Sequence, residues 1–368
     1  MNIIPVNRPL LNGNEKDYVT QAIDSGWVSS DGPFVEEFEH KFSKKVNRKY
    51  GIAVANGTAA LEVAIKALGI SIGQEVIMPT FTIISCALSV LRNSAKPVFV
   101  DCYPDTWNMN TEEIENKITS QTVAIMPVHI YGLPVDMNSV NRLAEKYKLA
   151  IVEDAAEAHG QTYFGKPCGS FGQLSTFSFY ANKHLTTGEG GMIVTDDWNL
   201  AEKCRKLRNL CFEPEKRFIH YDLGWNYRMT NLQAALGLAQ LENLENTLIR
   251  KKSLGLRYQK LLQQNQYLQT PITKMEGYQN NYWVFGVVVK PGSPQSASQI
   301  MEKLKNKGIG TRPFFWPMHK QPILTEFFQE RLPISELISE SGFYLPSGVG
   351  TTDDEIDESS AKLNEILL

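Results

Sequence analysis

From about Asn56 to Val194, short runs of apolar, mostly β-branched residues alternate with segments of helical pattern. This alternation is typical of βαβ units, which build a largely parallel sheet with helices on its faces. The stretches 76–79, 98–100 and 150–152 are continuously apolar, as expected of strands that are buried on both faces. The sequence therefore predicts a large α/β domain.

The same pattern places the individual elements of this domain. Helices are predicted at 58–68, 83–91 and 137–147. Strands are predicted at 75–80, 96–101, 123–132, 149–154, 176–180 and 192–196.

A second, smaller unit follows the first. Residues 231–264 form an amphipathic pattern that predicts one long helix or a pair of helices. A strand is then predicted at 282–290 and a helix at 296–307. We expect a large domain over 1–240, including the N-terminal segment, and a small C-terminal α+β domain over 241–368. Since no polar linker separates them, the two domains are expected to pack together.

The composition excludes several classes of function. The 368 residues carry a formal net charge of -3 at pH 7, which gives no electrostatic reason to bind nucleic acid or an acidic membrane. The longest apolar stretches, such as Val123–Val128, fall far short of the roughly 20 residues that span a bilayer, and the first residues lack the pattern of a secretory leader. Five cysteines without a C-x-x-C pair argue against a disulfide framework and a zinc ribbon. We expect a cytoplasmic protein with reduced thiols and no metal site.

The segment NGTAALEVAIKALG offers a place for an anion. Asn56 and Gly57 lie between a short apolar run and a good helix, so backbone N–H groups and the positive end of the helix dipole face the edge of the sheet. Taken alone, the segment reads equally as a turn followed by an N-cap.

The segment IVEDAAEAHG places Asp154 at the carboxyl end of an apolar strand, where open α/β folds bind their ligands. A carboxylate at that edge suits a positively charged partner such as a pyridinium nitrogen. The alternative is that Asp154 caps the following turn.

In TFSFYANKHLTTGEGGMIVT, Lys183 follows a strand and precedes a turn containing Gly188, Gly190 and Gly191. The glycines permit close approach of the backbone to a flat ligand, and a lysine amine fixed against that ligand can form a Schiff base. A lysine in a loop is otherwise usually solvated. The three segments together, each after a strand of one domain, predict a pyridoxal 5′-phosphate (PLP) site.

The chain resembles the sugar aminotransferase family often called DegT/DnrJ/EryC1/StrS, and the resemblance covers nearly its whole length. The similar segments are SGWVSSDGPFVEEFE, NGTAAL, MPTFT, PVFVD, MPVHIYG, EDAAEAHG, GSFG, TFSFYANKHLTTGEGGMIVT, WNYRMTNLQAALGLAQLE and RPFFWPMH. The resemblance implies a fold-type I PLP-dependent aminotransferase, with a mostly parallel sheet in its large domain.

The resemblance also assigns roles to residues. The Schiff-base lysine, which also moves the reaction's proton, falls on Lys183, and the carboxylate for the pyridine nitrogen on Asp154. The cofactor phosphate would be held by the backbone of Gly57 and Thr58 and by the Ser178 hydroxyl. Phe81 would stack on the cofactor ring. Glu157 would lie beside the ring oxygen, at a position where many relatives carry glutamine.

Four further residues near these motifs have candidate roles. Asn226 would reach the cofactor phosphate of a neighbouring subunit, which implies a homodimer with shared active sites, although by itself it reads as a turn residue. Arg312 and His319, in TRPFFWPMH, are candidate sugar or nucleotide contacts, with a structural role in the loop equally open. His184 directly follows Lys183; a related 3-dehydratase carries histidine in place of the lysine, but the spacing from Gly188 keeps the lysine here, so His184 is expected to be structural.

The resemblance implies transfer of an amino group from glutamate to a nucleotide-linked 4-keto-6-deoxy sugar. The chain looks most similar to GDP-perosamine synthases, which aminate C4 of GDP-4-keto-6-deoxymannose. UDP- and dTDP-linked keto sugars stay open as substrates, because no motif distinguishes guanine from uracil. A regulatory protein that holds PLP without turnover is a second class of function, and the complete set of Lys183, Asp154 and Ser178 argues against it.

Overall fold

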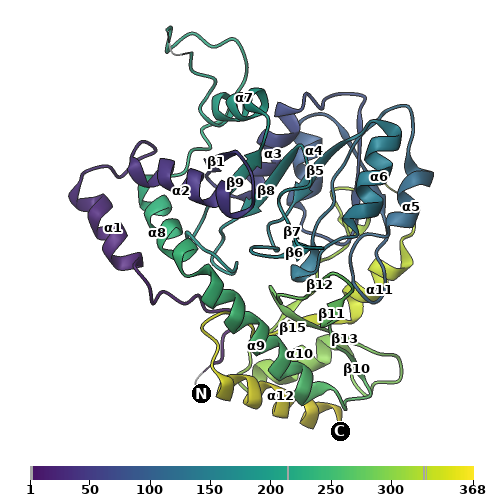
Figure 1. The fold of residues 1–368 in the computed structure, drawn as a ribbon. Helices are drawn as coiled ribbons and strands as arrows, with labels where there is room; N and C mark the ends of the chain where they lie inside the picture. Colours follow the sequence, from purple (N-terminus) through teal and green to yellow (C-terminus); the bar gives the residue numbers. More distant parts are fainter. Residues whose placement is uncertain (1–2, 214, 326–327, 329) are drawn as a thin grey trace.

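The computed structural model describes residues 3–213, 215–325, 328 and 330–368. Its larger part is built on a seven-stranded sheet with the strand order β1-β9-β8-β5-β4-β2-β3 (Figure 1). Strands β8, β5, β4, β2 and β3 are parallel, and β9 runs antiparallel to both of its neighbours. The strands are β1 Tyr50–Val54, β2 Glu75–Pro79, β3 Lys96–Val100, β4 Thr122–Ile125, β5 Ala150–Asp154, β8 Leu174–Ser178 and β9 Gly191–Thr195. The predicted α/β class with a mostly parallel sheet is confirmed.

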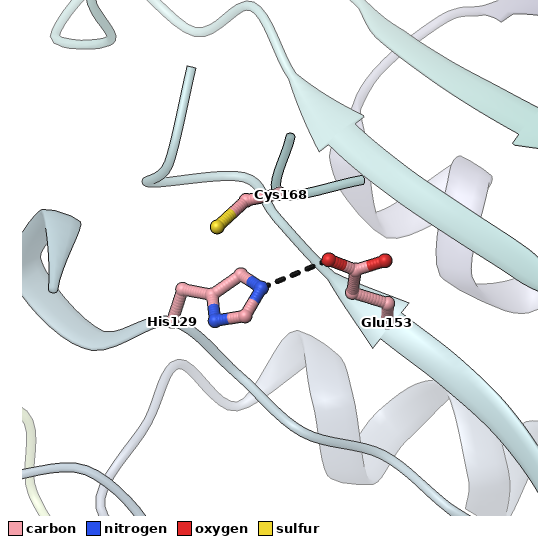
Figure 2. Close-up of side chains that lie close together, drawn as sticks. All are labelled: His129, Glu153 and Cys168. Atoms are coloured by element: carbon pink, nitrogen blue, oxygen red, sulfur yellow. Dashed lines mark hydrogen bonds and ion pairs between the residues drawn. The ribbon is translucent and has the colours of Figure 1, made fainter. Parts of the chain in front are cut away.

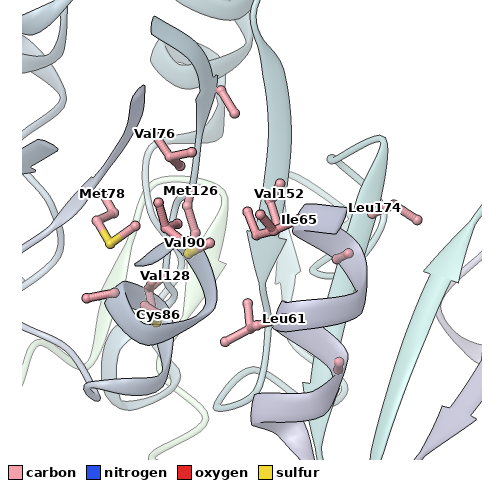
Figure 3. Close-up of a cluster of buried hydrophobic side chains, with 14 of the residues drawn as sticks. Leu61, Ile65, Val76, Met78, Cys86, Val90, Met126, Val128, Val152 and Leu174 are labelled. Carbon is pink, nitrogen blue, oxygen red and sulfur yellow. The ribbon is translucent and has the colours of Figure 1, made fainter. Parts of the chain in front are cut away.

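Helices cover both faces of this sheet, because successive side chains of each strand point to opposite sides. In β2, Val76 and Met78 pack with α3 (Gly57–Ala67) and α4 (Ser85–Arg92), as Figure 3 shows. Ile77, between them, packs in a separate cluster with α5 and α6 on the other face. The remaining helices of this part are α1 Glu15–Asp24, α2 Pro33–Lys45, α5 Thr111–Lys117, α6 Met137–Tyr147, α7 Trp198–Arg208 and α8 Asn231–Glu242.

The turn that begins α3 has the form that the sequence suggested. The Asn56 side chain accepts a hydrogen bond from the Ala59 amide at 2.8 Å and so caps the helix. Because β1 precedes this turn and points in the same direction as β8, the first turn of α3 lies at the carboxyl edge of the sheet.

The C-terminal part is built on a four-stranded antiparallel sheet with the order β10-β13-β15-β14. Helix α9 packs against α12, which also contacts α10. The elements are α9 Leu244–Leu262, β10 Leu268–Gln269, β13 Phe285–Val289, α10 Ala297–Asn306, β14 Arg312–Pro313, α11 Pro333–Ser341, β15 Gly342–Leu345 and α12 Asp353–Leu367. Two small hairpins and two short 3₁₀ turns complete the described structure: β6 Thr162–Tyr163 with β7 Lys166–Pro167, β11 Lys274–Met275 with β12 Tyr278–Gln279, η1 Ile130–Gly132 and η2 Met318–Lys320.

The first described residues lie against this C-terminal part, in the lower half of Figure 1. The Ile4 amide donates a hydrogen bond to the Gly308 carbonyl at 2.9 Å, and the Gly350 amide donates to the Arg8 carbonyl. The sequence grouped these first residues with the large domain, and the domain limits of 1–240 and 241–368 stay a prediction.

Two predicted elements differ in extent from the structure. The strand expected over 123–132 ends at Ile125, because the chain turns at Tyr131, whose φ of 54° lies in the left-handed region. The strand expected over 282–290 begins only at Phe285, because Tyr282 also has a positive φ. The long helical segment is a pair, α8 and α9. Within the described ranges, no helix has both the length and the apolar character needed to cross a membrane.

The packing of α3 on the sheet yields a stability prediction. Ile65 of α3 is fully buried, whereas Ile72, in the turn after the helix, is 81% exposed. Replacing Ile65 with Ala should lower the free energy of unfolding by about 2–5 kcal/mol, because it leaves a cavity in the core. Ile72→Ala, the same chemical change on the surface, should stay within about 0.5 kcal/mol of the parent. Denaturant unfolding of both variants makes the comparison, and equal losses would contradict the assigned packing.

Candidate functional site

The carboxyl edge of the large sheet borders a cavity of about 590 Å³. Side chains from both sheets reach it, because residues near β8 and β5 and residues near β13 and β15 share its lining. Six residues singled out from the sequence line this cavity: Gly57, Thr58, Asp154, Glu157, Ser178 and Lys183. Segments more than 120 positions apart in the chain therefore converge on one site.

One end of the cavity is formed by the first turn of α3, where helix amides have no acceptor within the helix. The hydroxyls of Thr58 and Ser85 lie 2.8 Å apart there. A Cβ on Gly57 would lie 2.8 Å from the Ser178 Cβ, so only glycine lets the helix start approach the end of β8 this closely. Free amides, hydroxyl groups and the positive end of a helix dipole form a cradle suited to a phosphate.

Asp154 is the last residue of β5 and is 2% exposed. One carboxylate oxygen accepts a hydrogen bond from the Ala156 amide at 3.0 Å, and the other accepts one from the Cys86 thiol at 3.3 Å. Burial raises the pKa of Asp154 above its ordinary value. Asp154 therefore both caps the following turn and lines the cavity.

Lys183 lies in the loop after β8, and its side chain is 9% exposed. Its Nζ is 3.6 Å from an oxygen of Glu157 and 3.8 Å from the centre of the Trp283 ring. Burial lowers the pKa of Lys183 and raises that of Glu157, whose second oxygen accepts a hydrogen bond from the Tyr131 amide at 2.8 Å. Lys183 is therefore a buried amine beside a buried carboxyl group, and not a solvated loop lysine.

The glycine turn after Lys183 holds this loop against the start of α3. A Cβ on Gly191 would lie 2.5 Å from the Asn56 carbonyl oxygen and 2.9 Å from that of Phe177. The turn thus brings the lysine loop and the helix cradle together.

Phe81 does not line the cavity. It is fully buried, and its ring centre lies 5.8 to 6.1 Å from those of Tyr131, Phe314 and Phe315. The next two residues of the chain, Thr82 and Ile83, do line the cavity, and so does its neighbour Phe315. The ring-stacking role that the resemblance implies for Phe81 stays a prediction.

Asn226, Arg312 and His319 also lie outside the cavity lining. Asn226 is exposed, next to Tyr227, which does line the cavity. Arg312 is exposed and pairs in register with another lining residue, Tyr344.

His319 and His184 have structural contacts instead. His319 is buried and bonded through its two ring nitrogens to Thr80 at 2.8 Å and Glu336 at 3.2 Å. The Nε2 of His184 contacts the Asn281 carbonyl at 3.2 Å, which agrees with the structural role expected for this residue.

Several lining residues gave no signal in the sequence. Trp283 comes from a stretch that read only as a strand, and Tyr344 from the mixed C-terminal segment. Ser85 lies in a predicted helix, and the sequence did not indicate that its hydroxyl would contact that of Thr58. Only the spatial neighbours of these residues identify them.

A buried cluster of His129, Glu153 and Cys168 lies on the opposite side of β5 from Asp154 (Figure 2). Glu153 accepts a hydrogen bond from His129 Nε2 at 2.9 Å, and His129 Nδ1 accepts one from the Val135 amide at 3.1 Å. Further donors to Glu153 are the amides of Phe171 and Gly172 and the hydroxyl of Ser175. These bonds hold Glu153 and His129 in place and so anchor the end of β5.

The cavity thus combines a buried amine, a buried carboxylate and a phosphate cradle. A PLP molecule needs these three groups at once. The absence of a side chain on Gly57 lets the Ser178 hydroxyl come close to the start of α3, where a phosphate would bind. The residues present therefore fit this cofactor.

Comparison with known proteins assigns the chain to a family. The model of the DegT/DnrJ/EryC1/StrS aminotransferase family matches residues 9–364. The GDP-perosamine synthase of Escherichia coli O157:H7 is 40% identical over 365 residues, which cover 99% of both chains. That of Caulobacter vibrioides is 42% identical over 366 residues, covering 99% of this chain and 98% of the relative. The solved structure of S. venezuelae DesV in complex with a ketimine intermediate has a TM-score of 0.89 at 31% identity and covers 96% of this chain and 94% of its own.

These matches confirm the fold and the kind of enzyme that the sequence predicted. The chain belongs to the DegT/DnrJ/EryC1/StrS aminotransferase family, whose cofactor is pyridoxal 5′-phosphate.

Proposed function

We propose that this chain converts GDP-4-keto-6-deoxymannose to GDP-perosamine, with glutamate as amino donor. The observation that carries the proposal is the placement of Lys183 and Asp154 in one buried cavity with the cradle at the start of α3. The choice of substrate is supported by the two GDP-perosamine synthases that match nearly the whole chain at 40% and 42% identity.

Three groups of this chain hold the cofactor in the proposed arrangement. The amides of Gly57 and Thr58 and the Ser178 hydroxyl would hold its phosphate, and Asp154 would keep its pyridine nitrogen protonated. When bound, the cofactor serves as an electron sink and carries the amino group between the two substrates. Burial raises the pKa of Asp154, so a positively charged partner in hydrogen-bond contact is what keeps this residue ionised.

Lys183 is the base of the reaction. Its free amine accepts a proton at Nζ from the substrate carbon and later returns one, which requires an amine that is uncharged part of the time. Burial lowers the pKa of Lys183 and so makes the uncharged form accessible. The neighbouring Glu157, whose pKa burial raises, can hold a proton without placing a second fixed negative charge beside the cofactor oxygen.

The nucleotide contributes binding energy at a distance from the reacting carbon. A nucleoside diphosphate that binds firmly can place the C4 carbonyl where the amino group is delivered, so that binding energy serves positioning. A free sugar lacks this group. Arg312, exposed beside the lining residue Tyr344, is a candidate for contact with the nucleotide or the sugar.

We further propose that two copies of the chain form a dimer with shared sites. The segment after α7 exposes Phe218, Tyr221 and Leu223, at 82%, 73% and 84% of their surface. Exposed apolar side chains gathered in one segment are typical of protein interfaces. In the proposed dimer, Asn226, three residues beyond, would reach the phosphate site of the second copy.

Lys183→Ala should abolish transamination and leave the fold intact, because it removes both the attachment amine and the base. The rate is expected to fall by many orders of magnitude, and mass spectrometry after borohydride treatment should find no cofactor attached to the chain. Circular dichroism provides the control for folding. Turnover at the parent rate, in a preparation free of wild-type enzyme, would contradict the central assignment.

Subunit mixing tests the shared site. Lys183→Ala and Asn226→Ala variants should each be nearly inactive alone and regain part of the activity after exchange, since one composite site then recovers both residues. Exchange itself is followed with differently tagged chains. Proven exchange without any recovery would argue against a contribution of Asn226 to the partner's site.

The nucleotide preference is decided by steady-state kinetics with GDP-, UDP- and dTDP-linked 4-keto-6-deoxy sugars. The GDP-linked sugar should give the highest kcat/KM, and free sugars should react poorly because they lack the remote binding energy. A clear preference for a UDP- or dTDP-linked substrate would refute the GDP assignment and leave the aminotransferase activity in place. A chain that binds PLP but whose spectrum does not respond to glutamate would instead be a non-catalytic member.

A further inference from the structure

We propose that Trp283 is a positioning residue for Lys183: the face of its indole ring holds the lysine amine in the cavity while the amine is charged. The inference deepens the proposed function and rests on it, because it concerns the same lysine. Trp283 lies outside every segment in which the sequence indicated cofactor chemistry.

The geometry places the charge over the ring. Lys183 Nζ lies 3.8 Å from the centre of the Trp283 ring, and Trp283 itself is 5% exposed. A cation over an aromatic face is attracted by the negative charge density of the ring, most strongly for tryptophan and in a desolvated place. The amine is therefore held between an aromatic face and the carboxyl group of Glu157, 3.6 Å away.

Trp283 also holds the loop that carries the lysine. Its Nε1 donates a hydrogen bond to the carbonyl of Asn182, the residue before Lys183, at 2.9 Å. One side chain thus contacts the charged end of Lys183 and fixes the backbone from which Lys183 extends. A ring that served only to fill space would need neither contact.

The backbone of Trp283 is fixed on both sides. Its amide donates to the Tyr131 carbonyl at 3.2 Å, and its own carbonyl accepts a hydrogen bond at 2.9 Å from the buried amine of Lys251 in α9. Lys251 also donates to the carbonyl of Ser347. The ring face is thereby held in place before the lysine moves.

The consequence is a bias on the protonation of Lys183. An attraction that exists only for the charged amine favours proton uptake, so Trp283 opposes part of the effect of burial, which lowers the pKa of Lys183. Five other ionisable groups influence this amine: Glu157, Asp154, Cys86, His159 and His184. A substitution of Trp283 leaves all five in the chain, so a change in the pKa of Lys183 can be assigned to the ring.

The test measures the amine in the protein freed of cofactor. Pyridoxal 5′-phosphate is added to the apoprotein over a range of pH, and the rate of covalent attachment is followed by visible absorbance. Because only the uncharged amine attacks the aldehyde, the rate rises with pH as Lys183 loses its proton. In Trp283→Leu this rise should move to lower pH by about one unit, the size expected for a desolvated cation–π contact.

Trp107→Leu is the matched control. Trp107 is equally buried and its ring centre lies 6.0 Å from that of Tyr131, where Trp283 lies at 5.8 Å, but Trp107 does not line the cavity. Its pH profile should coincide with that of the parent. Trp283→Phe retains a weaker aromatic face and should shift the rise in the same direction by less.

The outcomes separate this inference from the proposed function. A Trp283→Leu profile equal to that of the parent would overturn the role of Trp283, and so would equal shifts in the Trp283 and Trp107 variants. If Trp283→Leu does not fold, an unshifted Trp283→Phe overturns it instead. Attachment of cofactor to a Lys183→Ala apoprotein at the parent rate would mean that another lysine reacts, in which case the proposed function itself fails.

Discussion

The burial of one amine and two carboxyl groups in a single cavity is the constraint on which the rest of the structure depends. Buried ionisable groups are costly unless they have partners. Here Lys183 lies 3.6 Å from Glu157, and Asp154 accepts hydrogen bonds from Ala156 and Cys86. These arrangements require the end of β5, the loop after β8 and the start of α4 to meet at one edge of the sheet. The packing of the large sheet and its helices keeps these three segments in contact at that edge.

The two acidic residues at the end of β5 divide this task between the two faces of the strand. Glu153 points away from the cavity, where burial alone would raise its pKa but hydrogen bonds from His129 and from backbone amides lower it. It fixes the strand end and the loop that follows Cys168. Asp154, the next residue, lines the cavity. The hydrogen bonds of Glu153 hold the strand end from which it extends. The buried cluster around Glu153 and the cavity around Asp154 thus depend on the same strand end.

The C-terminal part of the chain completes the site by supplying its aromatic wall. The stretch before β13 leaves the sheet geometry at Tyr282, whose ring packs so closely on Gly255 of α9 that a Cβ there has no room. This packing directs Trp283 into the cavity, while Tyr131, also with a positive φ, directs its amide to Glu157. Both departures from regular strands were missing from the sequence prediction, because a single unusual φ follows from tertiary contacts and not from residue type.

The α/β class and the capped start of α3 could be predicted from the sequence, because hydrophobic period and cap chemistry act locally. The same local reasoning named Gly57, Asp154 and Lys183, and the family resemblance added Thr58, Ser178 and Glu157. Three placements came from the folded chain alone: Phe81 packs among aromatic rings, the N-terminal segment pairs with the C-terminal part, and Trp283 faces the lysine. These placements join residues far apart in the chain, and no local pattern encodes which side chain a distant segment will meet.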